Sequence, residues 1–156
     1  MSDLKKASVE QWGYTCGSGQ EAAALVWPVR FKPGMTLALV LAGLVLNNSW
    51  ILIVTGGAGI LGTLVQPLSW IDLFYNHVLR RLFHSPPLVA DPPMRRAMCG
   101  LADVFVLGAG LLLRENQALW AGLFAYAVIL LSGTVLLTGI CPPAYLVYRL
   151  RASKRA

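Results

Sequence analysis

Residues 119–140 read LWAGLFAYAVILLSGTVLLTGI, a long apolar segment without a single charged side chain. The hydrocarbon core of a bilayer is about 30 Å thick, and an α-helix of about 20 apolar residues crosses it. This segment therefore predicts a membrane-spanning helix. Three shorter apolar runs lie at about 29–46, 51–68 and 97–113. Together the four runs predict an all-α integral membrane fold with four transmembrane helices in two hairpins.

The composition of the 156-residue chain also favours a membrane protein. Hydrophobic residues make up 56% and charged residues 13%, against about 45–50% and about 25% in soluble domains. A small soluble domain has a large surface relative to its volume and needs more polar groups to cover it. Buried helices of a soluble protein are the alternative, but the connectors are too apolar for them. A disordered chain is excluded, because low hydropathy is what keeps chains unfolded.

The basic residues orient the four predicted spans. Of the thirteen Lys and Arg residues, all except Arg114 lie before or at the start of the first apolar run, between the second and third, or after the fourth. With four spans, these three regions lie on one side of the membrane. Positively charged loops stay in the cytoplasm, so we expect both termini there. Anionic lipid headgroups then account for the net charge of +6, and nucleic acid is not an expected partner.

The predicted spans divide the chain into three parts. Residues 1–28 form a cytoplasmic N-terminal segment, residues 29–150 the membrane domain, and residues 151–156 a basic cytoplasmic tail. No short apolar run with a cleavage site opens the chain, so no signal peptide is expected.

The connector at residues 69–84 predicts an amphipathic helix, because its apolar side chains recur at helical spacing. Such a helix, joined directly to a span and basic on its polar face, lies in the membrane interface. The alternative is a docking face for a cytoplasmic partner. The apolar face is formed by Trp70, Ile71, Phe74, Val78 and Leu82. Contacts with lipid headgroups or a partner are expected from Arg80, Arg81, Arg95 and Arg96.

The sequence offers few groups for metal binding or catalysis. The only histidines, His77 and His84, are both outside the predicted spans and too far apart to pair on adjacent helical turns. The sequence contains no phosphate-binding loop, dinucleotide-binding fingerprint or nucleophile elbow. We therefore expect no metal, no cofactor and no enzymatic activity.

Asp103 is the one acidic residue inside a predicted span. Carboxylates within the membrane are costly and often mark functional sites. Asp103 lies near the cytoplasmic end of its helix, so two interpretations stay open: ion pairing for assembly, and handling of a proton or substrate. The possible ion-pair partners are Lys32, Arg95 and Arg96.

Cys99 and Cys141 lie at opposite ends of the second hairpin and are candidate thiol or redox residues. An antiparallel hairpin places them at similar depth, at the cytoplasmic edge of the membrane. Cytoplasmic cysteines are normally reduced, so a permanent disulfide is not expected. Small apolar side chains at helix ends are the alternative interpretation.

Several motifs frame the hairpins: Arg30-Phe31, Ser85-Pro86-Pro87-Leu88, Asp91-Pro92-Pro93-Met94-Arg95-Arg96 and Thr138-Gly139-Ile140-Cys141-Pro142. Over roughly residues 29–150 they resemble an uncharacterised bacterial four-helix membrane family, a domain of unknown function. The second hairpin also resembles the membrane hairpin attached to some rhodaneses. Members of the four-helix family often occur near thioredoxin-like and sulfurtransferase proteins. The resemblance therefore implies a location in the bacterial inner membrane and a connection with sulfur or thiol chemistry.

The chain departs from the resembled family at one position of the closing motif. There the family commonly has a second cysteine three residues after the first, whereas this chain has Ala144. A dithiol mechanism confined to this motif is therefore excluded. Our leading expectation is a non-catalytic accessory or scaffolding subunit that packs against other membrane subunits or further copies of itself. The alternative is a sulfur- or thiol-redox-linked membrane protein acting with a rhodanese- or thioredoxin-like partner.

Overall fold

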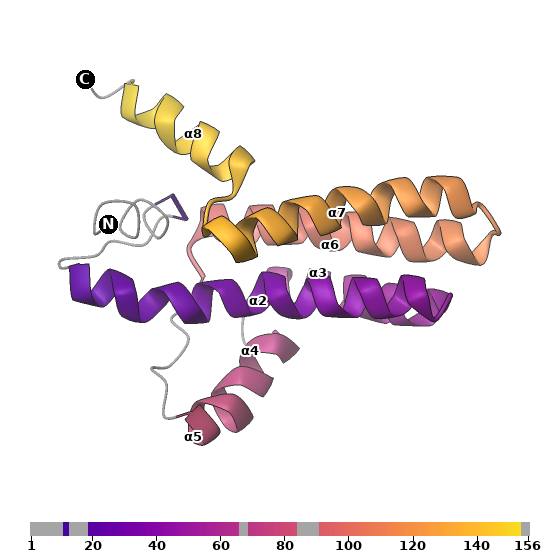
Figure 1. Cartoon of the computed structure of the whole chain (residues 1–156), viewed down its shortest axis with the longest axis horizontal. Coiled ribbons are helices and arrows are strands. Elements are labelled where there is room, and N and C mark those ends of the chain that lie inside the picture. The colour runs from indigo at the N-terminus through magenta and orange to yellow at the C-terminus, as the bar shows by residue number, and fades with distance from the viewer. Residues whose placement is uncertain (1–10, 13–18, 66–68, 84–90, 154–156) are drawn as a thin grey trace.

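The computed structural model describes residues 11–12, 19–65, 69–83 and 91–153, and every regular element in these ranges is a helix (Figure 1). The expected all-α fold is confirmed. The four long helices are α2 (Gly19–Val45), α3 (Ser49–Leu64), α6 (Pro93–Arg114) and α7 (Ala118–Thr138). The shorter helices are α4 (Trp70–Phe74), η2 (Tyr75–Leu79), α5 (Arg80–Phe83) and α8 (Pro142–Ser153).

The four long helices form a bundle of two antiparallel hairpins. Helix α2 packs against α3, α3 against α6, α6 against α7, and α7 against α2. Each long helix therefore has two neighbours, and the ring is closed. Both hairpin turns, at residues 46–48 and 115–117, lie at one end of the bundle, which we call the turn end (Figure 1). Helices α4 and α5 and the start of α6 lie toward the other end, the connector end.

The two hairpin turns use the same backbone motif. Asn47 and Asn116 adopt the left-handed conformation, with φ of 48° and 58°, which asparagine tolerates better than most residues. The next amide in each turn bonds to the carbonyl five residues earlier, at 2.9 Å in both cases. This bond defines a Schellman motif. In the first turn the Asn48 side chain also caps α3, because it accepts a hydrogen bond from the Trp50 amide at 3.0 Å.

Glycines let α3 and α6 approach closely at the centre of the bundle. A Cβ atom on Gly56 would lie 2.5 Å from the backbone nitrogen of Leu107, and one on Gly110 would lie 2.8 Å from that of Ile53. Close contact through small residues is typical of helix packing in membranes. The buried apolar cluster around this contact consists of Val40, Leu52, Val106, Ala109, Ala125 and Val128.

Two of the described helices, α6 with 22 residues and α7 with 21, are long and apolar enough to cross a membrane. Helix α3 is apolar but has 16 residues. Some boundaries differ from the expected spans. Helix α2 starts well before residue 29, and α3 ends before residue 68 because its cap, Val65, has extended backbone. Helix α6 starts at Pro93, a residue type that favours the first turn of a helix.

The predicted connector helix is present as α4, η2 and α5, which follow one another without a break. The central segment, η2, is a π-helix, whose wider turn shifts the helix face along its length. Ile71 and Tyr75, one helical turn apart, are buried, and Tyr75 packs on Phe31 with 5.2 Å between ring centroids. Phe74 and Val78 are exposed by 41% and 49%. The apolar residues thus divide between the bundle and the outer surface, while the Leu82 side chain lies outside the described part.

Candidate functional site

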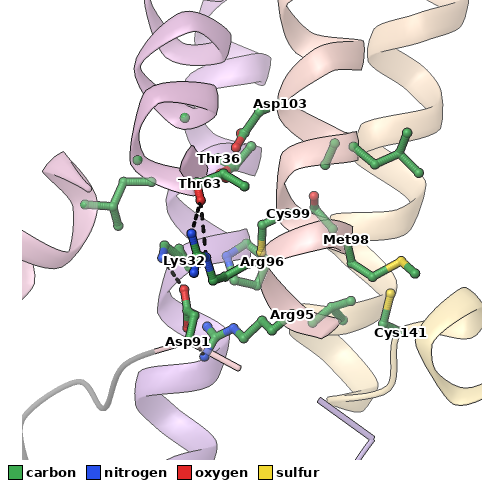
Figure 2. A pocket seen from close by; sticks show the side chains of 18 of the residues that line it. Lys32, Thr36, Thr63, Asp91, Arg95, Arg96, Met98, Cys99, Asp103 and Cys141 are labelled. Carbon is green, nitrogen blue, oxygen red and sulfur yellow. Dashed lines mark hydrogen bonds and ion pairs between the residues drawn. The ribbon is translucent and has the colours of Figure 1, made fainter. Parts of the chain in front are cut away.

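A cavity of about 160 Å³ lies between the long helices and α4. We call it the interhelical cavity. Its walls are mainly apolar, and polar side chains reach it from all four long helices (Figure 2). An apolar cavity with a few convergent polar groups is the usual form of a small-molecule site. The polar and ionisable lining residues include Lys32, Thr36, Thr63, Asp91, Arg95, Arg96, Cys99, Asp103, Ser132 and Cys141.

A buried ion-pair network forms one side of the cavity. Lys32 Nζ lies 2.5 Å from Asp91 Oδ2 and 2.9 Å from Asp72 Oδ2. The other carboxylate oxygen of Asp91 lies 3.1 Å from Arg95 Nη1. The network joins α2, α4 and the start of α6. Sequence reasoning did not predict Asp72 or Asp91 as ion-pair partners of these basic residues. Their position as rare acids in a basic connector was the available signal.

Arg95 is buried in the bundle rather than placed at its surface. Its side chain is 1% exposed, and Nη2 donates a hydrogen bond to the Val29 carbonyl at 3.0 Å. The guanidinium carbon also lies 5.9 Å from the centroid of the Trp12 ring, a distance suited to a cation–π contact. The burial of Arg95 leaves lipid headgroups no access to it. Arg80 and Arg81, by contrast, are exposed.

Arg96 binds the C-terminal end of α3. Its Nη2 donates to the Thr63 carbonyl at 2.7 Å and to the Leu64 carbonyl at 3.3 Å, and its Nε donates to Thr63 at 3.2 Å. The last carbonyls of a helix have no partner within the helix, and they carry a partial negative charge that attracts cations. Arg96 therefore fastens the end of the first hairpin to the start of the second.

Asp103 lies in the cavity wall at the contact between α3 and α6 (Figure 2). The three basic residues expected as its possible partners bind elsewhere, and Asp103 forms no ion pair within the described ranges. Instead the Thr63 hydroxyl donates a hydrogen bond to its carboxylate. A Cβ atom on Gly59 would collide with that carboxylate, so the glycine makes room for it.

Both candidate cysteines line the interhelical cavity and are free thiols. They are not adjacent, because Met98 lies between them in Figure 2. Cys141 is 6% exposed, and burial raises the pKa of its thiol. A higher pKa lowers the thiolate fraction at neutral pH, and the thiolate is the reactive form. The position therefore opposes nucleophilic chemistry at Cys141.

Gln11 covers the break between α7 and α8, a role that the sequence did not signal. Its Nε2 donates to the Gly139 carbonyl at 2.6 Å, and its Oε1 accepts from the Cys141 amide at 3.3 Å. The neighbouring Trp12 is 5% exposed and packs in a cluster with Cys141 and Ala144. Two residues of the N-terminal segment thus close this end of the bundle.

His77 interacts within its own helix. Its Nδ1 lies 3.1 Å from the Leu73 carbonyl in its own helix, and His84 lies outside the described residues. No group of three or more potential metal-binding side chains exists within the described ranges.

Comparison with known proteins identifies a family but no function. The family described as "Domain of unknown function (DUF4395)" matches residues 27–151, which is most of the chain. The protein therefore belongs to this family, in agreement with the resemblance seen in its motifs. No curated protein and no solved structure matches the chain.

Proposed function

We propose that this DUF4395 family member is a four-span protein of the bacterial inner membrane that acts as a non-catalytic accessory or scaffolding subunit. Both termini are cytoplasmic in this proposal. Its partners are the lipid bilayer and other membrane helices, from different subunits or from further copies of the chain. The supporting observations are the apolar outer surface of the bundle, the charge distribution, and two glycines that face away from the bundle.

The outer surface of the bundle suits lipid on every long helix. Large apolar side chains are exposed on α2, α3, α6 and α7, and isolated soluble proteins rarely expose such continuous apolar surfaces. In a bilayer the same surface contacts lipid and is not exposed to water. The most exposed members include Val45, Val54, Leu61, Leu64, Leu101, Leu123, Leu130 and Leu137.

The closed ring of helices and the charge distribution favour four spans rather than two. Helices α2 and α3 form a closed ring with α6 and α7, so the first hairpin accompanies the second through the bilayer. Helix α3 is about 24 Å long at 1.5 Å per residue, and a bilayer adapts to a short span by local thinning at modest cost. The ion-pair network and Arg96 lie at the connector end, where positively charged loops are retained in the cytoplasm.

Gly122 and Gly133 carry the proposal of a scaffolding role. Both lie on α7, and a Cβ atom on either would meet nothing within 4 Å. They are therefore not used for packing inside the bundle, in contrast to Gly56. Eleven residues separate them, about three helical turns, so they lie on the same face of α7. Small residues on one face allow close approach of another helix in the membrane.

The test is purification in mild detergent followed by mass determination of the intact assembly. We expect the wild-type chain to be recovered with other membrane chains or as an oligomer. Gly122→Leu together with Gly133→Leu should release the monomer, and the fold should survive because neither site has an internal neighbour. The matched control is Leu123→Phe, a bulky change on the same helix at a position 57% exposed and about a quarter-turn away from the face of the two glycines. A monomeric wild-type chain in mild detergent contradicts the proposal.

Topology is tested separately with fusion reporters. Reporters placed after residue 156 and within residues 85–92 should both report the cytoplasm, and a reporter at residues 115–117 should report the opposite side. A periplasmic signal at either of the first two sites contradicts the four-span arrangement.

A second candidate function is a sulfur- or thiol-linked role with a rhodanese- or thioredoxin-like partner. The observation in its favour is that Cys99 and Cys141 line the same cavity. The burial of Cys141 and the raised pKa of its thiol argue against it. The two candidates differ in one measurement, which is labelling by a water-soluble maleimide in inside-out vesicles. Slow labelling of both cysteines favours the scaffolding role, whereas rapid labelling of Cys141 or a trapped persulfide there favours the thiol role.

A further inference from the structure

We propose that the interhelical cavity binds the ring of a membrane-soluble quinone. This ligand class is neutral, contains one six-membered ring and carries oxygen atoms on opposite carbons of that ring. The proposal concerns binding alone. It goes beyond the scaffolding role, and only the route of access rests on the proposed membrane location.

The size and walls of the cavity suit one ring. Its volume is about 160 Å³, and an apolar cavity of about 150 Å³ in another protein holds benzene. Aromatic and aliphatic side chains from four helices make up most of the wall. They include Trp70, Phe105, Val128, Leu131 and Val135.

Hydrogen-bonding groups lie on different walls of the cavity. Asp103 and Arg96 lie on the wall formed by α3 and α6, where both contact Thr63. Ser132 lines the cavity from α7, which is not a neighbour of α3 in the ring. A ring with oxygens on opposite carbons can form one hydrogen bond with each wall. The guanidinium of Arg96 has five N–H donors, and those on Nε and Nη2 bind the end of α3.

Hydroxyl groups in the cavity wall can serve both oxidation states of such a ring. Thr36, Thr63 and Ser132 all line the cavity, and a hydroxyl group both donates and accepts hydrogen bonds. It can donate to a quinone carbonyl or accept from a quinol hydroxyl. The Asp103 carboxylate adds a further acceptor for the quinol form.

The charges in the cavity wall favour a neutral ligand. Lys32 and Arg95 are neutralised by Asp91 and Asp72, and Arg96 is bound to helix carbonyls. An anion would therefore have to compete with internal partners and would also meet the Asp103 carboxylate. A cation would meet three basic groups in the same wall. A neutral molecule with hydrogen-bonding oxygens avoids both costs.

Access from the membrane is provided by an apolar rim. Leu101 on α6 and Leu131 on α7 line the cavity and are also exposed by 55% and 41%. Both side chains therefore connect the cavity with the outer surface of the bundle. If that surface lies in lipid, as proposed above, a lipid-dissolved compound reaches the cavity without crossing water.

The experiment titrates the detergent-purified protein with decylubiquinone and measures tryptophan fluorescence. Trp12 and Trp70 line the cavity, so a bound quinone quenches them. We expect saturable quenching that persists when Trp50 and Trp120, at the turn end, are both changed to Phe. Ala102→Phe places a ring inside the cavity and should weaken binding by about tenfold or more, equivalent to about 1.4 kcal/mol. Ala97→Phe is the matched control, because Ala97 is exposed and outside the cavity.

Asp103→Asn provides a second variant that preserves side-chain size and keeps the test valid if Ala102→Phe fails to fold. It should weaken binding of the reduced compound, decylubiquinol, more than that of decylubiquinone, measured by competition. Quenching that rises linearly and disappears in the double Trp→Phe variant indicates partition into micelles and overturns the proposal. Equal binding by the Ala102→Phe and Ala97→Phe variants also overturns it. These outcomes leave the topology and assembly tests unaffected, because those tests use no ligand.

Discussion

The two ends of the bundle are held together by different kinds of interaction. At the turn end, Asn47 and Asn116 reverse the chain through backbone hydrogen bonds between residues close in sequence. One contact between the hairpins there is made by Arg114, whose guanidinium lies 5.0 Å from the Trp50 ring centroid. At the connector end, Lys32 and Arg95 join helices that are far apart in sequence.

This difference means that the interactions that form each hairpin are distinct from those that hold the two hairpins together. Each turn is complete within its own hairpin and does not need the other hairpin. The ion-pair network and the Arg96 contacts exist only when both hairpins are in place. Substitutions at the connector end should therefore destabilise the whole bundle, whereas those at the turn end should affect one hairpin by a smaller amount.

The largest effect is expected from Arg95→Met at the connector end. This change leaves the buried Asp91 carboxylate with one cation fewer, and breaking a buried ion pair in this way costs about 3–5 kcal/mol. The measurement is the free energy of unfolding by denaturant in detergent micelles. Adding Asp91→Asn should recover part of the loss, because Lys32 keeps Asp72 as a partner. Arg80→Met, at an exposed position, is the control, and an equal effect of the two Arg→Met changes would contradict the comparison.

A smaller effect is expected from Gly56→Val, between the two ends. The new side chain meets the α6 backbone, and overpacking costs about 1–3 kcal/mol. Gly57→Val is the matched control on the same helix, since a Cβ there has nothing within 4 Å. The unfolding free energy of both variants is measured as before. If the two valines are equally tolerated, the α3–α6 contact does not hold the hairpins together.

At the turn end, Asn116→Ala should cost about 1 kcal/mol, because alanine disfavours the left-handed backbone. Asn116→Gly should cost less, since glycine adopts positive φ without steric penalty. The same pair of changes at Asn47 should give the same ranking, because the two turns share one motif. Thermal unfolding in detergent ranks the four variants. Equal thermal stability of the alanine and glycine variants at either turn would show that the positive φ there does not affect stability.

The smallest effect is expected from Arg114→Gln, which removes the contact with Trp50. Both side chains are exposed, and an exposed cation–π contact contributes about 0.5–1 kcal/mol. The coupling is measured by a double-mutant cycle with Trp50→Leu. A coupling energy as large as the loss in Arg95→Met would remove the distinction between the two ends.

The sequence predicted the parts of the fold that depend on local patterns. The apolar runs indicated the long helices, and the short gaps within each pair of runs indicated the two hairpins. The connector helix followed from apolar spacing, but the π-turn at Tyr75–Leu79 was not predictable from that spacing. Ile71 and Phe74, expected on one face, also have different surroundings, because Ile71 is buried and Phe74 is exposed.

The candidate site was only partly predictable. Asp103, Cys99 and Cys141 were singled out, and all three line one cavity. The ion-pair partner of Lys32 was not predictable from the sequence. The choice among Asp72, Asp91 and Asp103 depends on how α2, α4 and α6 pack. Burial of Arg95 was missed for a related reason. A positively charged connector suggests surface contacts, and the interior contact requires Val29 and Trp12 from elsewhere in the chain.

The contact of Arg96 with the end of α3 has a consequence for biosynthesis. The carbonyls of Thr63 and Leu64 accept hydrogen bonds from a side chain that lies 33 and 32 positions later in the chain. In the four-span arrangement proposed above, the first hairpin leaves the ribosome before this arginine does. The carbonyls then have to stay hydrated at the membrane surface until it arrives, because unpaired backbone groups are not tolerated in the hydrocarbon core. In that arrangement the first hairpin reaches its final depth only when the second hairpin enters the membrane beside it.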